Sequence, residues 1–200
     1  MNKKTHDRIA DLFLSLLNRT NKSRLFVSNG FLFAAAFRYL EKNPEDRVVH
    51  IVRDPLTAAP SYAAIINNRK KSALAWKTVP FWNLTPVHTD EMEKEEWSRL
   101  TKTEKLCWIW KVKNNYIKKM CSRFPGRCIT VRFEDLFLNV DKEEYRQKLL
   151  DFARLTSKKE FFRNLDIKQN ASGPDIGLSE EFTEAVMRIC PEERKTFGYN

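Results

Sequence analysis

The sequence predicts an α/β fold, a three-layer domain in which a mainly parallel sheet is flanked by helices. Three short runs rich in β-branched and aromatic residues, at 24–28, 47–53 and 127–133, have the length and composition of strands. Helical patterns lie between these runs, and strands that alternate with helices form parallel pairs with right-handed crossovers. No repeat, low-complexity tract or linker divides the chain, so residues 1–200 are expected in one domain.

The run at 47–53 is the central strand. Its apolar residues do not alternate with polar ones, which is typical of a strand covered on both faces of a parallel sheet. These apolar residues are Val48, Val49, Ile51 and Val52. An Asp-Pro pair follows and ends the strand, because proline has no N–H for the ladder and restricts the residue before it.

Helical periodicity predicts the other elements. Apolar residues recur at helical spacing, and prolines, glycines or capping residues bound each segment. The predicted helices cover residues 8–18, 31–42, 57–71, 91–99, 103–124, 142–155 and 180–189, with Thr57, Asp141 and Ser179 as amino-terminal caps. Residues 72–90 lack periodicity and contain two prolines, so a long loop is predicted there. This loop is either a substrate lid with aromatic walls or an irregular loop pinned to the core by its tryptophans.

Composition and charge limit the classes of function. Hydrophobic residues make up 42% of the 200 residues, which excludes a disordered chain. The formal net charge of +10 favours an anionic partner. The 36 basic residues are interleaved with 26 acidic ones and form no recognition motif, which argues against nucleic acid. No apolar run approaches the roughly 18 residues of a membrane span and no signal peptide is recognised, so a cytoplasmic protein without a membrane span is expected.

Cysteine and histidine spacing predicts no metal site. The four cysteines form no Cys-x-x-Cys pair and have mostly apolar neighbours, so we expect reduced residues in or near the core. They are Cys107, Cys121, Cys128 and Cys190. The three histidines are too far apart for metal-ligand spacing. They are His6, His50 and His88.

Arg53 falls at the carboxyl end of the central strand, the edge at which open α/β sheets bind ligands. With Thr57 as cap and Pro60 in the first turn, Ser61 falls near the amino end of the next helix. A guanidinium, a hydroxyl and a helix amino terminus together suit a phosphate. The alternative is an Arg53–Asp54 surface pair and a serine that only caps the helix.

The segment Arg53-Asp54-Pro55, with Ser61 eight positions after Arg53, resembles the segment that holds the 3′-phosphate in sulfotransferases. These enzymes transfer a sulfuryl group from 3′-phosphoadenosine 5′-phosphosulfate (PAPS). The resemblance implies that Arg53 and Ser61 bind the 3′-phosphate of PAPS as co-substrate, without a metal. It also implies an acceptor hydroxyl or amine on a small molecule, a carbohydrate or a protein.

Two further segments agree with this family in order and spacing. The run Val-Arg-Phe-Glu-Asp-Leu at 131–136 resembles the family's strand and Tyr-Glu-Asp-Leu segment. The run Phe-Gly-Tyr at 197–199 resembles the Leu-Gly-Tyr ending of many bacterial members. The resemblance covers roughly residues 24–200 and implies a sulfotransferase-like fold, similar to that of P-loop nucleoside triphosphate hydrolases.

The sequence departs from the family in its amino-terminal part. The family's 5′-phosphosulfate loop, typically Pro-Lys-Ser/Gly-Gly-Thr-Thr/Ser, has no counterpart among the five glycines. The run Ser-Asn-Gly at 28–30 stands where relatives often have a Lys or His. We therefore expect a carboxyl-terminal portion of a longer enzyme, or a divergent, non-catalytic module that binds a 3′-phosphorylated nucleotide. A P-loop kinase is excluded because Gly-x-x-x-x-Gly-Lys-Ser/Thr is absent.

Few residues are candidates for a catalytic role in sulfuryl transfer. His88, in the aromatic loop, is a candidate base, and the alternative is an ordinary exposed histidine. Glu134 and Asp135 suggest a paired-carboxylate mechanism, but residues at this place after a strand more often start a helix or form ion pairs. Arg194 and Lys195 either reach the sulfuryl donor or form a solvated basic tail.

Overall fold

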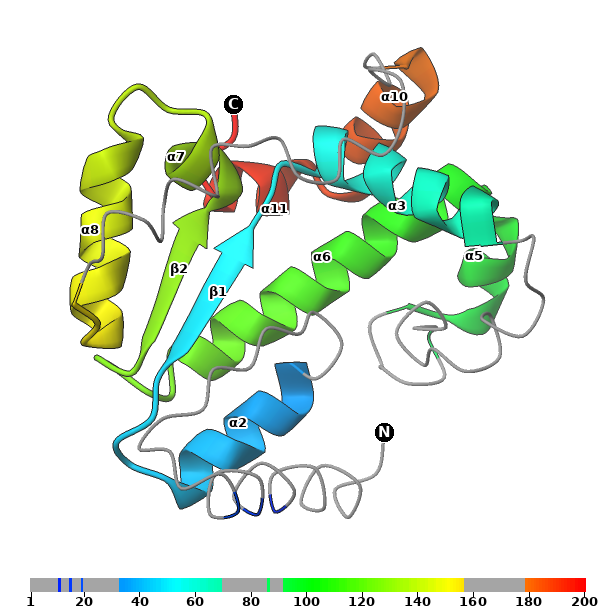
Figure 1. Cartoon of the computed structure of the whole chain (residues 1–200). Coiled ribbons are helices and arrows are strands. Elements are labelled where there is room, and N and C mark those ends of the chain that lie inside the picture. Colours follow the sequence, from blue (N-terminus) through cyan, green and yellow to red (C-terminus); the bar gives the residue numbers. More distant parts are fainter. Residues whose placement is uncertain are drawn as a thin grey trace.

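A computed structural model describes residues 11, 15, 19, 33–69, 86, 92–156 and 179–200. The elements, shown in Figure 1, are α2 (Phe33–Lys42), β1 (Val48–Val52), α3 (Pro55–Arg69), α5 (Lys94–Arg99), α6 (Lys102–Cys121), β2 (Cys128–Arg132), α7 (Phe133–Phe137), α8 (Lys142–Ala153), α10 (Glu180–Ile189) and α11 (Pro191–Thr196). The described part is rich in helix and contains a two-stranded parallel sheet. The predicted α/β class is confirmed in this coarse form.

The sheet brings together two segments far apart in the chain. β1 and β2 run parallel, in register from Val48 opposite Cys128 to Val52 opposite Arg132. The strands predicted at 47–53 and 127–133 are therefore confirmed, whereas the strand predicted at 24–28 lies outside the described residues. Both strands end at the same edge, beside α7, α11 and the carboxyl terminus (Figure 1).

The two faces of β1 are covered unequally. His50 and Val52 point to one face and are buried against α6, with Val52 in the main core cluster beside Trp110. Ile51 points to the other face and is 48% exposed. The prediction of a strand covered on both faces is therefore wrong at Ile51, because α6 packs on the face of His50 and Val52 only.

Helix α6 begins one residue before its predicted start, and its cap explains why. Thr101 Oγ1 accepts from Glu104 N (3.2 Å), and Thr101 N donates to Glu104 Oε2 (2.8 Å). This reciprocal capping box satisfies two otherwise free N–H groups of the helix start. The helix ends at Cys121, three residues before its predicted end.

The caps of the later helices agree with the sequence in one case and differ in another. Ser179 caps α10 as predicted, accepting from Phe182 N at 3.4 Å. Asp141 precedes α8, but its side chain makes no capping bond and its N–H donates to Asn139 Oδ1 (3.0 Å) instead. Helix α11 has no predicted counterpart. It starts at Pro191, where a missing N–H costs nothing.

Two predicted segments lie almost wholly outside the described residues. The loop at 72–90, with the candidate base His88, is described only at Pro86, and the helix at 8–18 only at Asp11 and Ser15. No helix among the described residues is long and apolar enough to span a membrane. The described side chains also include no group of three His, Cys, Asp or Glu that could hold a metal ion.

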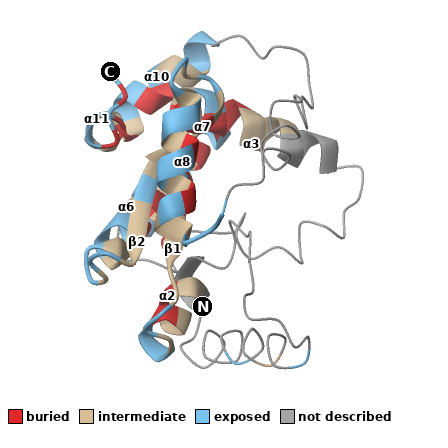
Figure 2. Cartoon of the chain, turned by 60° about the vertical axis from the view of Figure 1, so that its left-hand side comes forward, coloured by how far each residue is buried: buried red, intermediate tan, exposed pale blue. Residues whose placement is uncertain are grey.

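Buried residues gather where α6 meets the sheet and the carboxyl-terminal helices (Figure 2). The main core cluster joins β1, α3, α6 and residues 185–199. Cys107 and Cys190 are buried in it, and Cys121 and Cys128 are half-buried against a smaller cluster around Phe37. The predicted place of the cysteines, in or near the core, is confirmed.

His50 is a buried polar residue between the strands and α6. Asn114 Nδ2 donates to Trp110 O (2.7 Å), so its Oδ1 is free to accept from His50 Nε2 (2.8 Å). His50 Nδ1 then accepts from Thr130 Oγ1 (3.3 Å). Burial lowers the pKa of His50 to about 4, so the ring is neutral at pH 7.

Candidate functional site

The chain passes from β1 into α3 through Asp54, which caps the helix. Asp54 Oδ1 accepts from Leu56 N (3.0 Å), and Asp54 O accepts from Ala58 N (2.8 Å). Helix α3 therefore begins at Pro55, and the prediction that Thr57 caps it is wrong. The reason is that proline is favoured at the first helical position, which makes the preceding aspartate the cap.

The earlier helix start changes the place of Pro60 and Ser61. Pro60 is the sixth residue of α3, not part of its first turn, and has no N–H to donate to the carbonyl of Leu56. Ser61 follows in the second turn, further from the helix amino terminus than predicted. The helix dipole falls off within the first turn, so its contribution at Ser61 is small.

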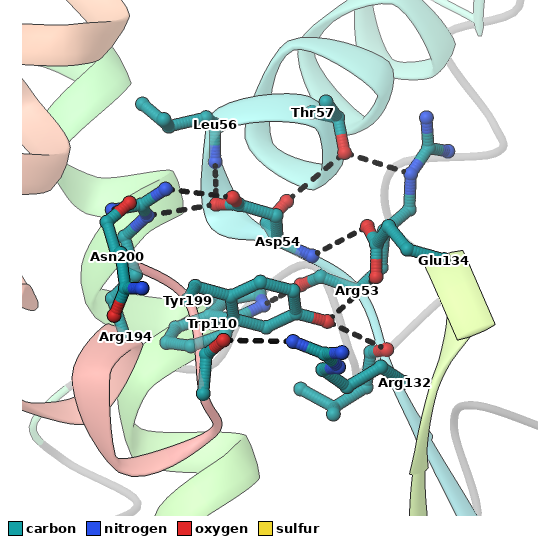
Figure 3. Close-up of polar contacts among 12 residues, drawn as sticks. Arg53, Asp54, Leu56, Thr57, Trp110, Arg132, Glu134, Arg194, Tyr199 and Asn200 are labelled. Carbon is teal, nitrogen blue, oxygen red and sulfur yellow. Dashed lines mark hydrogen bonds and ion pairs between the residues drawn. The ribbon is translucent and has the colours of Figure 1, made fainter. Parts of the chain in front are cut away.

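Arg53, Thr57 and Ser61 form a row at the start of α3. Thr57 and Ser61 are four residues apart in the helix, which places them on the same helix side, and Arg53, two residues before the helix, contacts Thr57. Arg53 Nε donates to Thr57 Oγ1 (2.9 Å), and Thr57 Oγ1 donates to the Asp54 carbonyl (3.1 Å), as Figure 3 shows. Thr57 is exposed, and Arg53 and Ser61 are half-buried. The Ser61 hydroxyl makes no hydrogen bond with a described residue.

No carboxylate among the described residues holds the Arg53 guanidinium, which packs on an aromatic ring instead. Its Cζ lies 4.9 Å from the centre of the Phe133 ring, and its carbonyl accepts from Trp110 Nε1 (2.9 Å). Its two terminal nitrogens make no hydrogen bond or ion pair with any residue that the structure describes. The guanidinium therefore keeps a fork of donors for a ligand. The predicted alternative, an Arg53–Asp54 pair, is wrong.

Asp54 pairs instead with Arg194 from helix α11. Arg194 Nε donates to Asp54 Oδ1 (3.1 Å) and Arg194 Nη2 to Asp54 Oδ2 (2.9 Å). Arg194 Nη1 donates to the carbonyl of Asn200, and the side chain is 10% exposed. The prediction of a solvated tail is thus wrong for Arg194, because α11 folds back onto the sheet edge. The prediction of a solvated residue is correct for Lys195, which is exposed and pairs with Glu192.

Glu134 closes the edge between the two strands. Its Oε1 accepts from Asp54 N (3.1 Å) and its Oε2 from Tyr199 Oη (2.7 Å). Tyr199 Oη also lies 3.2 Å from the Val52 carbonyl. Burial, with the hydrogen bond to Glu134, raises the pKa of Tyr199 well above its ordinary value. Glu134 is therefore used for structure and not available as a base.

Asp135, like Glu134, makes a structural contact. Arg132 Nε and Nη2 donate to its two carboxylate oxygens (2.8 and 2.7 Å), and this bidentate pair lowers the pKa of Asp135. Arg132 Nη1 donates to the Gly198 carbonyl (2.7 Å). Gly198 has a φ of +78°, which a glycine adopts without strain at the end of α11. Glu134 and Asp135 thus start α7 and form structural contacts, as the favoured interpretation of the sequence had it.

Among the described residues of this edge, Arg53 is the arginine that no carboxylate neutralises. Arg194 is neutralised by Asp54, and Arg132 by Asp135. Arg53 has no carboxylate partner among the described residues: its side chain contacts the Thr57 hydroxyl and the Phe133 ring, and its charge acts on the nearby Tyr62. The Thr57 hydroxyl contacts it, and Ser61 follows one turn further along α3. This arrangement can bind an anion with several oxygens, such as a phosphate.

Arg53 and Ser61 were predictable from the sequence, whereas the roles of Thr57, Arg194 and Tyr199 were not predicted. The four-residue spacing of Thr57 and Ser61 in the predicted helix was a usable signal for Thr57. No local signal pointed to the Arg194–Asp54 pair. His88, the candidate base, lies outside the described residues. No protein-family model, curated protein or solved structure matches this chain.

Proposed function

We propose that this chain is a sulfotransferase, or the nucleotide-binding part of one, and that it binds PAPS by the 3′-phosphate at the carboxyl edge of the sheet. The observation that carries the proposal is the Arg53 guanidinium, whose terminal nitrogens have no partner among the described residues. We also propose that β1 and β2 belong to a larger parallel sheet of the sulfotransferase type. Their parallel pairing, with the ligand edge at the carboxyl ends, supports this.

Each residue of the row has a distinct role in the proposed site. Arg53 supplies a charged, bidentate donor to two phosphate oxygens. Thr57 holds Arg53 by its Nε, so the fork is oriented before the ligand arrives. Ser61 supplies a neutral hydrogen bond one turn further along α3. These contacts orient the donor of the sulfuryl group and contribute affinity more than chemistry.

Sulfuryl transfer is an in-line displacement at sulfur, in which a base takes the acceptor proton and positive charge stabilises the leaving phosphate. The described carboxylates of the edge do not supply this base, since Asp54, Glu134 and Asp135 are each engaged by an arginine or a tyrosine. This favours a second candidate function, a module that binds a 3′-phosphorylated nucleotide without turnover. His88 is the residue we propose as base if the chain is an enzyme.

Adenosine 3′,5′-bisphosphate is expected to bind and stabilise the protein, by about 2.7 kcal/mol at roughly 100 times its dissociation constant. Arg53→Lys keeps the charge but loses the fork, so affinity should fall by about tenfold. Ser61→Ala should cost roughly 1 kcal/mol of binding free energy, or about fivefold in affinity. Isothermal titration calorimetry measures these values, and Arg123→Lys, at an exposed arginine of the α6–β2 turn, is the matched control.

Adenosine 5′-monophosphate, which lacks the 3′-phosphate, should not distinguish wild type from Arg53→Lys. Equal affinity of wild type and Arg53→Lys for the bisphosphate would show that Arg53 is not a phosphate ligand and would overturn the proposed site. Transfer of sulfuryl from PAPS to a phenol or a carbohydrate then separates the two functions. Turnover that is lost in His88→Ala indicates the enzyme, and binding without turnover indicates the module.

A further inference from the structure

Phe133, to which the proposed function gives no role, lies against the guanidinium of Arg53. The register of the sheet brings the two residues together. Val52 is opposite Arg132 at the end of the ladder, so Arg53 and Phe133 are the next residues of two neighbouring parallel segments. The Cζ of Arg53 lies 4.9 Å from the centre of the Phe133 ring, which is within the range of a cation–π interaction. The sheet therefore places an aromatic ring beside the cation of the proposed site.

The Phe133 ring is itself held in place by helix α7 and the start of α8. Phe137 follows one helical turn later, and the centres of the two rings are 4.6 Å apart at an interplanar angle of 32°. The Cζ of Arg146 lies 6.0 Å from the centre of the Phe137 ring. Arg146 is 2% exposed, and its Nε donates to the carbonyl of Leu136 at 2.9 Å. Packing of this kind locks side-chain rotamers, so Phe133 is a fixed support for Arg53.

Phe133 and Thr57 hold different parts of the Arg53 side chain. Thr57 Oγ1 accepts from Nε at 2.9 Å, and Cζ lies over the Phe133 ring. Neither contact uses the two terminal nitrogens, which make no hydrogen bond or ion pair with the residues that the structure describes. A long side chain that is fixed before its ligand arrives loses less rotamer freedom on binding, and this raises its affinity.

We propose that Phe133 is a positioning residue of the phosphate site, whose ring holds the Arg53 guanidinium with both terminal nitrogens turned to the 3′-phosphate. Phe133 acts through Arg53 and not on the phosphate itself. An arginine stacks on an aromatic ring by its planar, delocalised charge, so the ring fixes the plane of the fork as well as its position. This inference rests on the proposed function, since it assigns a residue to the same site.

The test is calorimetric titration of the whole chain and its variants with adenosine 3′,5′-bisphosphate. Phe133→Leu keeps an apolar side chain against Phe137 but removes the aromatic ring, so the affinity should fall about fivefold. Phe133→Tyr keeps the ring and should bind as wild type does. Adenosine 5′-monophosphate, which lacks the 3′-phosphate, should bind wild type and both variants equally.

Two controls separate positioning from a general loss of structure. Phe124 also lies beneath an arginine, with the Cζ of Arg127 5.5 Å from its ring centre, but in the turn before β2, at the opposite end of the sheet. Phe124→Leu should therefore leave the affinity for the bisphosphate unchanged. In the background of Arg53→Met, which has no guanidinium to hold, Phe133→Leu should cause no further loss of affinity.

The outcomes distinguish this inference from the proposed function. If Arg53→Lys weakens binding of the bisphosphate and Phe133→Leu does not, the inference is wrong and the phosphate site stands. Equal losses in Phe133→Leu and Phe124→Leu, or a further loss in the Arg53→Met background, would mean that the ring supports only the fold, and would also overturn the inference. A wild-type chain that does not bind the bisphosphate would overturn the proposed function, and the role of Phe133 with it.

Discussion

Replacing Arg194 with methionine is expected to lower the free energy of unfolding by about 3–5 kcal/mol, the usual cost of breaking a buried ion pair. The substitution keeps the aliphatic stem but leaves the Asp54 carboxylate, only 16% exposed, with a single remaining donor from Leu56. Urea unfolding followed by circular dichroism measures the change as a shift in midpoint.

Lys195→Met is the matched control for this substitution. Lys195 is the next residue of α11, and its pair with Glu192 is exposed, so its removal should change the free energy of unfolding by at most about 1 kcal/mol. If the two variants lose similar amounts of stability, the Arg194–Asp54 pair does not hold α11 on the sheet edge.

The stability of the fold is expected to fall by about 3 kcal/mol between pH 6.5 and pH 4 because of His50. The pKa of His50 is lowered to about 4 in the folded chain by burial, against an ordinary value of 6.5. Between these two values the unfolded chain binds a proton that the folded chain does not. Stability from this group is therefore complete above pH 6.5 and is lost as the pH falls toward 4.

The variant His50→Gln isolates this effect from other titrations. Glutamine does not titrate and can still hydrogen-bond to Asn114, so the difference in unfolding free energy between wild type and variant should shrink as the pH falls. The pKa of Asp135 is lowered by Arg132, so that group acts at more acidic pH in both proteins. A difference that stays constant from pH 7 to pH 4.5 would contradict the assigned environment of His50.

Local patterns predicted much of the fold. The strands and the helices α6, α8 and α10 follow from apolar periodicity with turns or caps at their ends, all of which operate over a few residues. The Asp-Pro pair correctly marked the end of β1. The same pair also predicts that α3 begins at Pro55 with Asp54 as its cap, because proline is favoured at the first helical position. The prediction of Thr57 as the cap did not take this preference into account.

The site was predictable only in part, because its contacts join distant residues. Arg194 and Asp54 are separated by 140 positions and Tyr199 and Glu134 by 65, so no local pattern relates them. The partner of Asp54 decides whether Arg53 is free, since a carboxylate held by Arg194 is withdrawn from Arg53. Sequence alone left both arrangements open, and only the return of α11 to the sheet distinguishes them.

The register of the sheet has a consequence for how the chain folds. Every pair of the β1–β2 ladder joins residues 80 positions apart, and closing a loop of that length costs on the order of 4 kcal/mol in chain entropy. Helix α6 needs only local contacts and lies inside this loop, so it should form first and offer its apolar side as a surface on which the strands meet. Pulse-labelled hydrogen exchange during refolding should therefore protect the amides of α6 before those of β1 and β2. Simultaneous protection would mean that sheet and helix form in one step.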